Sequence, residues 1–368
     1  MFGKNKKNER GKSSGSFSNT KNKTQNNLRL ALIALLVLGL LLLFGRVFQF
    51  FNEFQKPYYS LNTAKRSVSW DGKSVINVVI AKSQDGALTD LNFVSLNPDE
   101  EKMSVLNLSE DIYVDVPKNF GSWKLGSVYK LGQENNPKIG EDLVKMSISK
   151  MLALPVDGII EVNQKEDLNV ELLVSEWKKN MFSRFNFLSR VKTDLTLKET
   201  TDFVFKAAKV RPDNTISVDF FKTSLTQSKL LPDSSRVLGV DAVKLDTLIK
   251  KELSDPRISN EDLTIAIFNG TDHAGLTAEA VRLIGNLGSR VTIISNSGEK
   301  FVKSGIYINP EEASEDVKNS RTYIRLAEIF ASECLKESCT TADQEVASSR
   351  AAINIVLGEQ YYNYWSSR

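Results

Sequence analysis

The pattern of apolar residues begins with an uninterrupted run from Leu30 to Gly45, extended by further apolar residues as far as Phe51. A bilayer core about 30 Å thick needs roughly 20 helical residues, and residues 28–51 supply them. A cleaved signal peptide is the competing interpretation, but bulky residues follow the run where a small-x-small cleavage site would be needed. The pattern therefore favours a transmembrane signal anchor at residues 28–51.

A region of short β-rich runs follows, from about Ser67 to Asn163. We predict strands in "VINVVIA", "LNFVSLN", "MSVLNLS" and "DIYVDVP", and a hairpin between the second and third, because "NPDEEKM" has the residues of a tight turn. A helix over Gly140 to Leu154 precedes a strand in "VDGIIEVN", and one face of this helix combines Leu143, Met146, Ser147 and Met151. This order predicts an α/β domain of two or three layers.

Between Gln164 and Val240 the periodicity is weaker. "DLNVELLVSEWKKNMFSRFNFLSRV" predicts a pair of helices, "TISVDFFKTSL" a strand, and Pro232 with Asp233 a turn or extended connection. The next segment, "DAVKLDTLIKKELSDPRISNED", holds an amphipathic helix that ends before Pro256 and directs inward Val243, Leu245, Leu248 and Ile249. We interpret residues 254–262 as a linker into a second domain.

The second domain has the clearest pattern. A strand over Leu263 to Phe268 leads through "NGTDHAG" into a helix that ends at Gly288 and buries Leu276, Ala280, Leu283 and Leu287. "RVTIIS" and "GIYINP" predict two more strands, and "AAINIVLG" a last one. Between them, a long helix over Ala313 to Leu335 presents Val317, Ile324, Ala327 and Phe330. The β-α-β-β-α-β order predicts a small α/β sandwich.

The distribution of charge predicts how the chain is oriented in the membrane. The chain has a net charge of only +3, but its first 29 residues hold eight Lys or Arg residues against Glu9 alone. This block has almost no apolar residues, so we interpret residues 1–27 as a disordered basic tail that stays cytoplasmic, with the chain exported from about Asn52. It has no interleaved aromatic residues, so we expect no nucleic-acid binding.

Cysteine and histidine are scarce. Cys334 and Cys339 are the only two cysteines and stand five residues apart, so an oxidising exterior would permit a disulfide if their side chains meet. One His and two Cys cannot build a standard four-ligand zinc site without carboxylates, so we expect no metal. His273 lies beside Asp272 without an identifiable nucleophile, which favours an exposed turn residue or a helix cap.

The turn "NGTDHAGL" partly fits a phosphate-binding loop. Gly270, Gly275 and Thr277 occupy three of its four fixed places, but Leu276 stands where a lysine must neutralise phosphate charge. A tight strand-to-helix turn explains the same residues better.

The residues from "LTIAIFNGTDHAGLTAEAVRLIGNLGSRVTIISN" onward resemble the LytR C-terminal domain. The shared features are the turn of Asn269, Gly270 and Thr271, the Gly275-Leu276 pair that opens the helix, and the final strand "AAINIVLGEQY". The resemblance covers about 100 residues, which we delimit as 263–362. It implies a cell-envelope role as a binding or interaction module, since no catalytic machinery is established for that domain.

The preceding region, residues 67–253, resembles a LytR-CpsA-Psr (LCP) domain in "LTDLNFVSLNPDEEKMSVLNLSEDIYVDVP", "WKLGSVYKLG" and "LPVDGIIEVN". Such domains transfer glycopolymers from polyprenyl-pyrophosphate carriers to the cell wall, with arginines that grip the pyrophosphate and an aspartate that aids metal or base chemistry. Here Ala87 or Leu88 stands for the first arginine, Glu110 for the second and Gly126 for an asparagine. The resemblance retains only Asp111 and, with a one-residue shift, Asp90.

Two hypotheses follow. The first is a non-enzymatic, single-pass envelope protein with a degenerate LCP-like domain and no cofactor, whose partners are the bilayer at residues 28–51 and a wall glycopolymer or envelope protein. The second is a working transferase with Asp111 and Asp90 as catalytic residues and Mg²⁺ as cofactor, aided by displaced lysines such as Lys102, Lys118, Lys124 or Lys130. We favour the first, because loss of arginine removes electrostatic stabilisation of the transition state.

Overall fold

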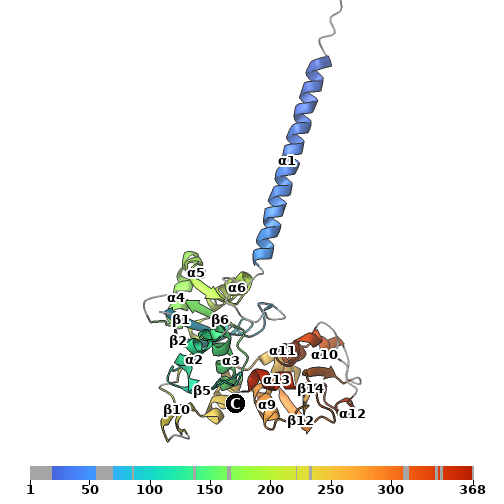
Figure 1. Cartoon of the computed structure of the whole chain (residues 1–368). Coiled ribbons are helices and arrows are strands. Elements are labelled where there is room, and N and C mark those ends of the chain that lie inside the picture. Colours follow the sequence, from blue (N-terminus) through green and yellow to red (C-terminus); the bar gives the residue numbers. More distant parts are fainter. Residues whose placement is uncertain are drawn as a thin grey trace, which may run out of the picture. The chain divides into compact units, whose positions relative to one another are not determined.

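The computed structural model describes residues 19–54, 69–84, 87–135, 138–163, 167–220, 222–231, 234–309, 315–335, 339 and 343–366. The chain divides into two compact units, Met1–Gln55 and Lys56–Arg368 (Figure 1). The three hydrophobic cores consist only of residues from the second unit, so that unit folds around its own interior. Each unit is described by itself below.

The first unit contains one helix, α1 (Asn19–Phe54). Its stretch Leu30–Gln49 has a mean hydropathy of 2.7 and is long and apolar enough to cross a membrane. The helical anchor at residues 28–51 is therefore confirmed as a helix. The disordered tail was predicted too long, because residues 19–27 continue the helix once the apolar stretch has formed it, whereas residues 1–18 lie outside the described part.

The second unit begins with a six-stranded sheet in the order β7-β6-β1-β2-β3-β8. Its strands are β1 (Ile76–Gln84), β2 (Ala87–Asn97), β3 (Lys102–Asn107), β6 (Gly158–Val162), β7 (Val191–Thr193) and β8 (Thr215–Asp219). The predicted hairpin is β2–β3, which closes at the pair Asn97 and Lys102. β1 pairs antiparallel with β2, while β6 and β8 add parallel strands beside β1 and β3.

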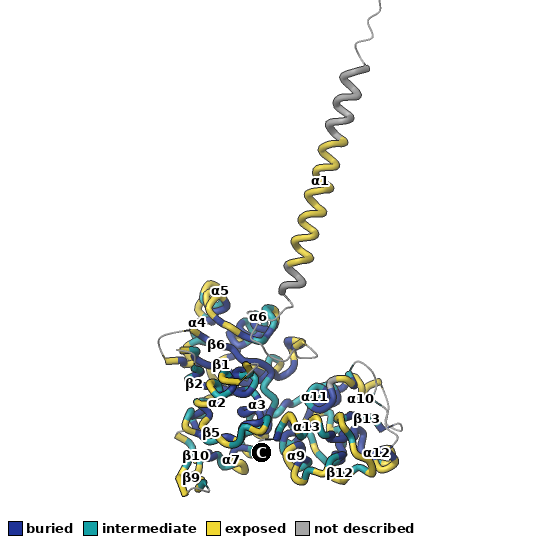
Figure 2. The backbone as a smooth tube through the Cα atoms, in the orientation of Figure 1, coloured by how far each residue is buried: buried dark blue, intermediate teal, exposed yellow. Residues whose placement is uncertain are grey.

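Helices cover both faces of this sheet, so the domain has three layers. Residues alternate between the two sides along β1: Val79 packs in the core that includes α2 (Leu125–Gln133) and α3 (Gly140–Leu152). Val78 packs on the opposite side, in the core formed with α4 (Val170–Lys179), α5 (Met181–Leu188) and α6 (Leu197–Ala207). Both faces of the central strands are therefore buried (Figure 2), as expected for a strand of continuous apolar sequence.

Smaller elements extend this domain. β4 (Tyr113–Val116) pairs with β5 (Gly121–Lys124), so the predicted strand in "DIYVDVP" lies outside the central sheet. β9 (Thr226–Leu230) and β10 (Arg236–Val240) form a hairpin that sequence reasoning did not predict, after the short 3-10 helix Pro212–Asn214. The predicted turn at Pro232 and Asp233 lies outside the described residues.

The amphipathic helix before the second domain is α7 (Ala242–Glu252). Leu245 and Ile249 are fully buried, but Val243 is 77% exposed, so its predicted inward position is wrong. The physical reason is helix geometry, because residues two positions apart do not face the same side. The expected linker, residues 254–262, contains α8 (Pro256–Glu261), which begins at Pro256 and buries Ile258.

The C-terminal sheet has the order β12-β11-β14-β13 and the predicted succession of elements. Its strands are β11 (Thr264–Asn269), β12 (Arg290–Asn296), β13 (Gly305–Ile308) and β14 (Ile353–Leu357). The helices are α9 (Leu276–Leu287), α10 (Glu315–Asn319), α11 (Arg321–Phe330), α12 (Gln344–Ala347) and α13 (Glu359–Trp365). All four residues predicted on the inner face of α9 are buried, and Gly288 ends the helix at φ +105°.

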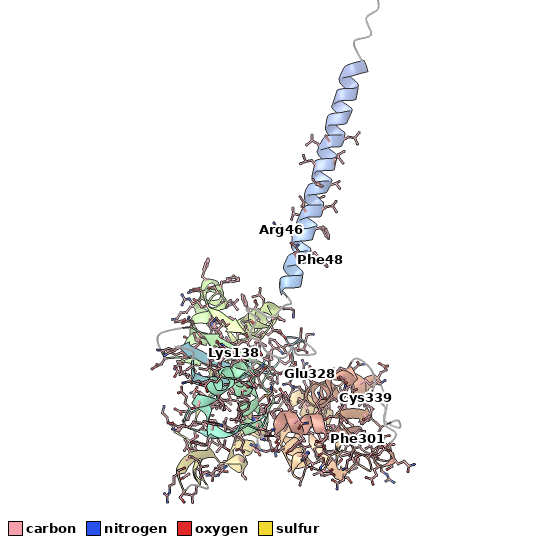
Figure 3. The ribbon with its side chains drawn as sticks, in the orientation of Figure 1. Arg46, Phe48, Lys138, Phe301, Glu328 and Cys339 are labelled. Atoms are coloured by element: carbon pink, nitrogen blue, oxygen red, sulfur yellow. A yellow bond between two sulfur atoms is a disulfide. The ribbon has the colours of Figure 1, made fainter. Side chains whose placement is uncertain are left out.

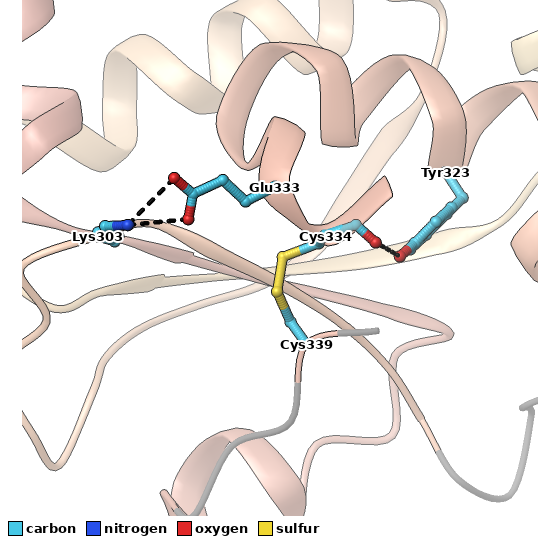
Figure 4. Close-up of a disulfide and its surroundings, with 5 residues drawn as sticks. All are labelled: Lys303, Tyr323, Glu333, Cys334 and Cys339. Atoms are coloured by element: carbon cyan, nitrogen blue, oxygen red, sulfur yellow. Dashed lines mark hydrogen bonds and ion pairs between the residues drawn. A yellow bond between two sulfur atoms is a disulfide. The ribbon is translucent and has the colours of Figure 1, made fainter. Parts of the chain in front are cut away.

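The predicted long helix over Ala313 to Leu335 is divided. Ser320 has extended backbone and caps α11, because its side chain accepts a hydrogen bond from the Tyr323 amide. A 3-10 turn at Ser332–Leu335 follows, and Ala313 lies outside the described residues. Cys334 and Cys339 form a disulfide there (Figure 4), beside the ion pair of Lys303 with Glu333.

Polar contacts of α9 and α11 join the C-terminal sheet region to the three-layer domain. Arg282 and Asn286 of α9 donate to the carbonyls of Met151 and Leu152 at the end of α3, at 3.0 Å each. Arg325 of α11 forms a buried ion pair with Asp157 at 2.7 Å, and Glu328, labelled in Figure 3, lies 3.0 Å from the same guanidinium. Burial alone would lower the pKa of Arg325, but the two carboxylates outweigh it and raise that pKa.

Replacing Arg325 by Met should therefore destabilise the unit, because Asp157 would remain buried without its cation. We expect the free energy of unfolding to fall by about 3–5 kcal/mol, measured by denaturant titration of residues 56–368. Arg350→Met is the matched control at an exposed arginine, with an expected change of less than about 0.5 kcal/mol. Equal effects of the two substitutions would contradict a structural role for the buried pair.

Candidate functional site

Asp90, one of the two predicted catalytic acids, lies in β2 with a positive φ of 50°. Its carboxylate accepts a hydrogen bond from the Leu168 amide at 3.1 Å and lies 3.7 Å from the Lys82 ammonium. Its backbone amide donates to the Glu110 carboxylate at 2.9 Å. Asp90 and Glu110 are therefore neighbours, although 20 positions separate them in the sequence.

Gly126 completes this arrangement. Its amide donates to the Glu110 carbonyl at 3.0 Å, and a Cβ atom on Gly126 would approach the Glu110 Cβ to 2.9 Å. Glu110 and Gly126, which the sequence comparison placed at an arginine and an asparagine of the LCP pattern, are thus neighbours. Glu110 contributes a carboxylate here, and Gly126 contributes only backbone. Leu88, at the place of the first arginine, is buried in the core and does not reach Glu110.

Asp111 faces a different partner. Its side chain is 64% exposed and pairs with Lys124 at 2.8 Å, and the hydrogen bond from that ammonium raises the pKa of Lys124. The partner of its carboxylate is Lys124, whereas the carboxylate of Asp90 contacts Leu168 and Lys82. The catalytic roles of Asp90 and Asp111 stay predictions.

The four lysines considered for displaced phosphate binding contact different groups. Lys102 pairs with Glu252 at 3.0 Å, Lys124 pairs with Asp111, and Lys118 lies 5.8 Å above the ring of Tyr364. Lys130 is exposed in the last turn of α2. Two of the four are already neutralised by a carboxylate, and these contacts do not join the four into one cationic site.

A small cavity of 210 Å³ lies next to Asp90. Its polar lining includes Asn92, Asn107, Glu171 and Asp219, and no basic side chain is among its described lining residues. No group of three or more metal-binding side chains was found in the described part of the chain. A pyrophosphate would meet negative charge here, because the lining carries three carboxylates.

The turn of the C-terminal region is built from its own hydrogen bonds. The Asn269 side chain accepts from the amide and hydroxyl of Thr271 at 3.1 and 2.8 Å and donates to the His273 carbonyl at 3.0 Å. Gly270 touches Phe301, which Figure 3 labels, and Gly275 precedes α9 at φ +87°. Leu276 is 5% exposed, so it is an inward residue of α9, as the sequence indicated.

His273 does not cap the helix. Its ring stacks on Tyr362 of α13, and its Nε2 lies 3.0 Å from the Glu359 carboxylate. The turn is thereby fixed to α13, which is a structural role.

The largest cavity described, 870 Å³, lies between the three-layer domain and the C-terminal sheet region. Five aromatic side chains contribute to its lining: Trp70, Phe330, Tyr361, Tyr364 and Trp365. Its basic side chains are paired with acids: Lys145 lies 3.2 Å from Asp142, Arg321 lies 3.3 Å from Asp255, and Lys303 pairs with Glu333. We call this the interdomain cleft. Sequence reasoning missed it, although the aromatic segment "EQYYNYW" was a signal for it.

Residues 262–361 match the sequence model of LytR_C, described as LytR cell envelope-related transcriptional attenuator. This segment is a LytR_C domain. The predicted C-terminal domain is confirmed, with bounds one residue from those predicted at each end. The description of the family relates the chain to the cell envelope. Among curated proteins, none matches the chain.

Several solved structures are similar to the part of the chain before the LytR_C domain and share its α/β class. B. subtilis TagT is 18% identical, with a TM-score of 0.36 over 54% of this chain and 96% of that chain. The LytR-CPS2A-psr family protein YwtF (TagT) with bound octaprenyl pyrophosphate lipid is 17% identical, with a TM-score of 0.38 over 53% of this chain and 99% of that chain. B. subtilis TagV is 15% identical, with a TM-score of 0.34 over 48% and 94%.

A pair of buried acids lies in the domain before the LytR_C domain. Glu161 of β6 and Glu141 of α3 are 4% and 8% exposed, and Glu141 accepts hydrogen bonds from Tyr129 and Gln133 at 3.3 Å. One carboxylate oxygen of Glu161 has no hydrogen-bond partner. Burial raises the pKa of Glu161 to about 7, while Glu141 adds to the effect, Lys192 opposes it and Asp194 adds a smaller part.

The free energy of unfolding should therefore depend on the ionisation of Glu161. Between its ordinary pKa of 4.5 and about 7 the folded chain holds the proton that the unfolded chain releases, so stability falls as pH rises through this window. Between pH 5 and pH 8, the free energy of unfolding of Glu161→Gln should increase by up to about 3 kcal/mol relative to that of the wild type. Denaturant titrations at several pH values measure the difference. Glu134→Gln at an exposed position should show no such trend, and a pH-independent difference for Glu161→Gln would contradict the raised pKa.

Proposed function

We propose that the protein is a membrane-anchored, extracytoplasmic component of the cell envelope that binds envelope glycan and does not transfer it. One observation carries the proposal: a carboxylate, Glu110, occupies the point where Asp90 and Gly126 meet. A pyrophosphate has several negative charges and needs bidentate cationic partners, which arginine provides. An acid at this point reverses the local field.

The surroundings of Glu110 support the same conclusion. The cavity beside Asp90 is lined by carboxylates and amides, and Lys102 and Lys124 are each held by a carboxylate at 3.0 Å or less. Moving Lys102 or Lys124 toward the cavity would break its ion pair with Glu252 or Asp111. Stabilisation of developing charge requires groups that are already positioned, and none of these lysines is positioned there.

Helix α1 supports the proposed location at the membrane. Twenty residues of α1, Leu30–Gln49, have the length and hydropathy of a membrane span, and the basic residues cluster before it. The positive-inside rule places that cluster in the cytoplasm and residues 56–368 outside. A disulfide between Cys334 and Cys339 fits an oxidising exterior.

The interdomain cleft is the best candidate for the binding site. Aromatic rings beside paired acids and bases give flat apolar faces together with hydrogen-bonding groups and little net charge. A carbohydrate chain has matching properties, since its rings have apolar faces and its hydroxyl groups donate and accept hydrogen bonds. We therefore propose a wall glycopolymer as the ligand.

Purified residues 56–368, incubated with polyprenyl-pyrophosphate-linked glycan, Mg²⁺ and a wall acceptor, should give no transferred product. Radiolabelled glycan and chromatography of the acceptor measure transfer, with an active LCP transferase as positive control. Asp111→Ala should behave as the wild type. Turnover by the wild type that Asp111→Ala abolishes would establish the alternative, a transferase that uses Asp111 and Asp90 with Mg²⁺.

Tyr364→Ala should weaken binding of wall glycan fragments about tenfold, or about 1.4 kcal/mol, because it removes an exposed ring from the interdomain cleft. The matched control is Trp123→Ala, since both side chains are 44% exposed and Trp123 does not line the cleft. Isothermal titration with purified fragments measures both. A similar loss for the two variants, or no binding by the wild type, would contradict a glycan site in the cleft.

A further inference from the structure

Helix α5 contains exposed residues (Figure 2), and several of them are apolar. Met181, Phe182 and Phe185 are 57%, 85% and 53% exposed, and Leu172 of the neighbouring α4 is 64% exposed. Phe182 has the highest exposure of the large hydrophobic residues in the described part of the chain. We call these four residues the α5 patch.

The fold does not need these side chains outside. The other face of α5 buries Phe187 and Leu188, and the ring of Phe187 packs 4.7 Å from that of Trp177. The core beneath α5 is therefore already filled. On the outer face, Phe185 contacts Phe205 of α6 edge-on, with 6.2 Å between the ring centres, whereas Phe182 is 85% exposed. An exposed ring of this kind favours contact with a further apolar surface.

Positive charge lies along the segment that carries most of the α5 patch. Residues 177–191 contain four basic residues and no acidic one: Lys178, Lys179, Arg184 and Arg190. None of the four forms an ion pair within the described residues. Arg184 is held in place, since its Nε donates to the Trp177 carbonyl at 2.7 Å and its guanidinium lies 4.8 Å from the Phe205 ring centre. The charges point to an anionic partner.

The chain enters the folded unit in the same layer. Trp70 belongs to the core formed with α4, α5 and α6, and its amide donates to the Glu199 carboxylate of α6 at 2.6 Å. Only 14 sequence positions, 55–68, separate this point from the end of α1. If α1 spans the bilayer, the layer that carries the α5 patch is therefore the part of the folded unit that follows the membrane span first in the sequence.

We propose that the α5 patch docks on the anionic lipid surface of the membrane, with Phe182, Phe185 and Met181 in the interfacial region and the basic side chains on phosphate headgroups. The membrane location rests on the proposed function, whereas the lipid affinity belongs to the patch itself. Apolar residues flanked by Lys and Arg bind anionic bilayers in this manner.

Vesicle flotation tests the affinity without the anchor. Residues 56–368 should float with vesicles that contain phosphatidylglycerol and much less with phosphatidylcholine alone. The double variant Phe182→Asp/Phe185→Asp should lose binding about tenfold or more, while Val302→Asp, at a 77% exposed residue of the LytR_C domain, should retain it. An unchanged thermal midpoint of the variants shows that they are folded.

The full chain in proteoliposomes tests the contact in place. A fluorophore on Phe182→Cys should shift to the blue and be quenched by lipid-borne spin labels, and a fluorophore on Val302→Cys should not. The accessibility of Val302→Cys to an impermeant reagent reports the topology separately, so a failed proposed topology is distinguishable from a failed patch. Absence of binding to anionic vesicles at low salt, or a water-exposed Phe182 label, overturns the proposal and leaves a protein partner.

Discussion

The buried ion pair of Arg325 with Asp157 joins the LytR_C domain to the domain before it, beside an apolar core that is continuous between the two. Asp157 also accepts a hydrogen bond from the Asn77 amide at 2.8 Å, so one carboxylate ties together β1, the segment before β6 and α11. A buried charge is strongly destabilising when its partner is lost, so the pair opposes separation of the two domains at this point. Both residues also line the interdomain cleft, whose shape therefore depends on the same pair.

The first domain shows that a fold and its chemistry are separable. Its central strands are stabilised by side chains such as Val79 and Phe93, which are fully buried and have no part in charge recognition. Glu110 accepts a hydrogen bond from the backbone amide of Asp90, which an arginine could not do because a guanidinium only donates. The charge at this point is therefore set by one side chain outside the buried core of the sheet. A retained sheet is thus weak evidence for a retained reaction.

Local patterns were predictable from the sequence, and long-range ones were not. The inner face of α9 followed directly from the spacing of Leu276, Ala280, Leu283 and Leu287, since helical periodicity depends on neighbours along the chain. The break at Ser320 was missed because a capping serine is indistinguishable from a helical one until its side-chain hydrogen bond is seen. Arg325 and Asp157 are 168 positions apart, and no local sequence pattern predicts their contact. The interdomain cleft, which both residues line, could not be predicted for the same reason.

A surface contact on the same chain as a membrane-spanning helix would not have to be strong. Binding of a second site on one chain is an intramolecular event, so its effective concentration is high and a weak intrinsic affinity suffices. The α5 patch has four apolar side chains that are 53% to 85% exposed, and stronger affinity would require a larger apolar surface. A larger surface would also promote aggregation during folding, so a small apolar patch with basic neighbours is what the proposed membrane contact requires.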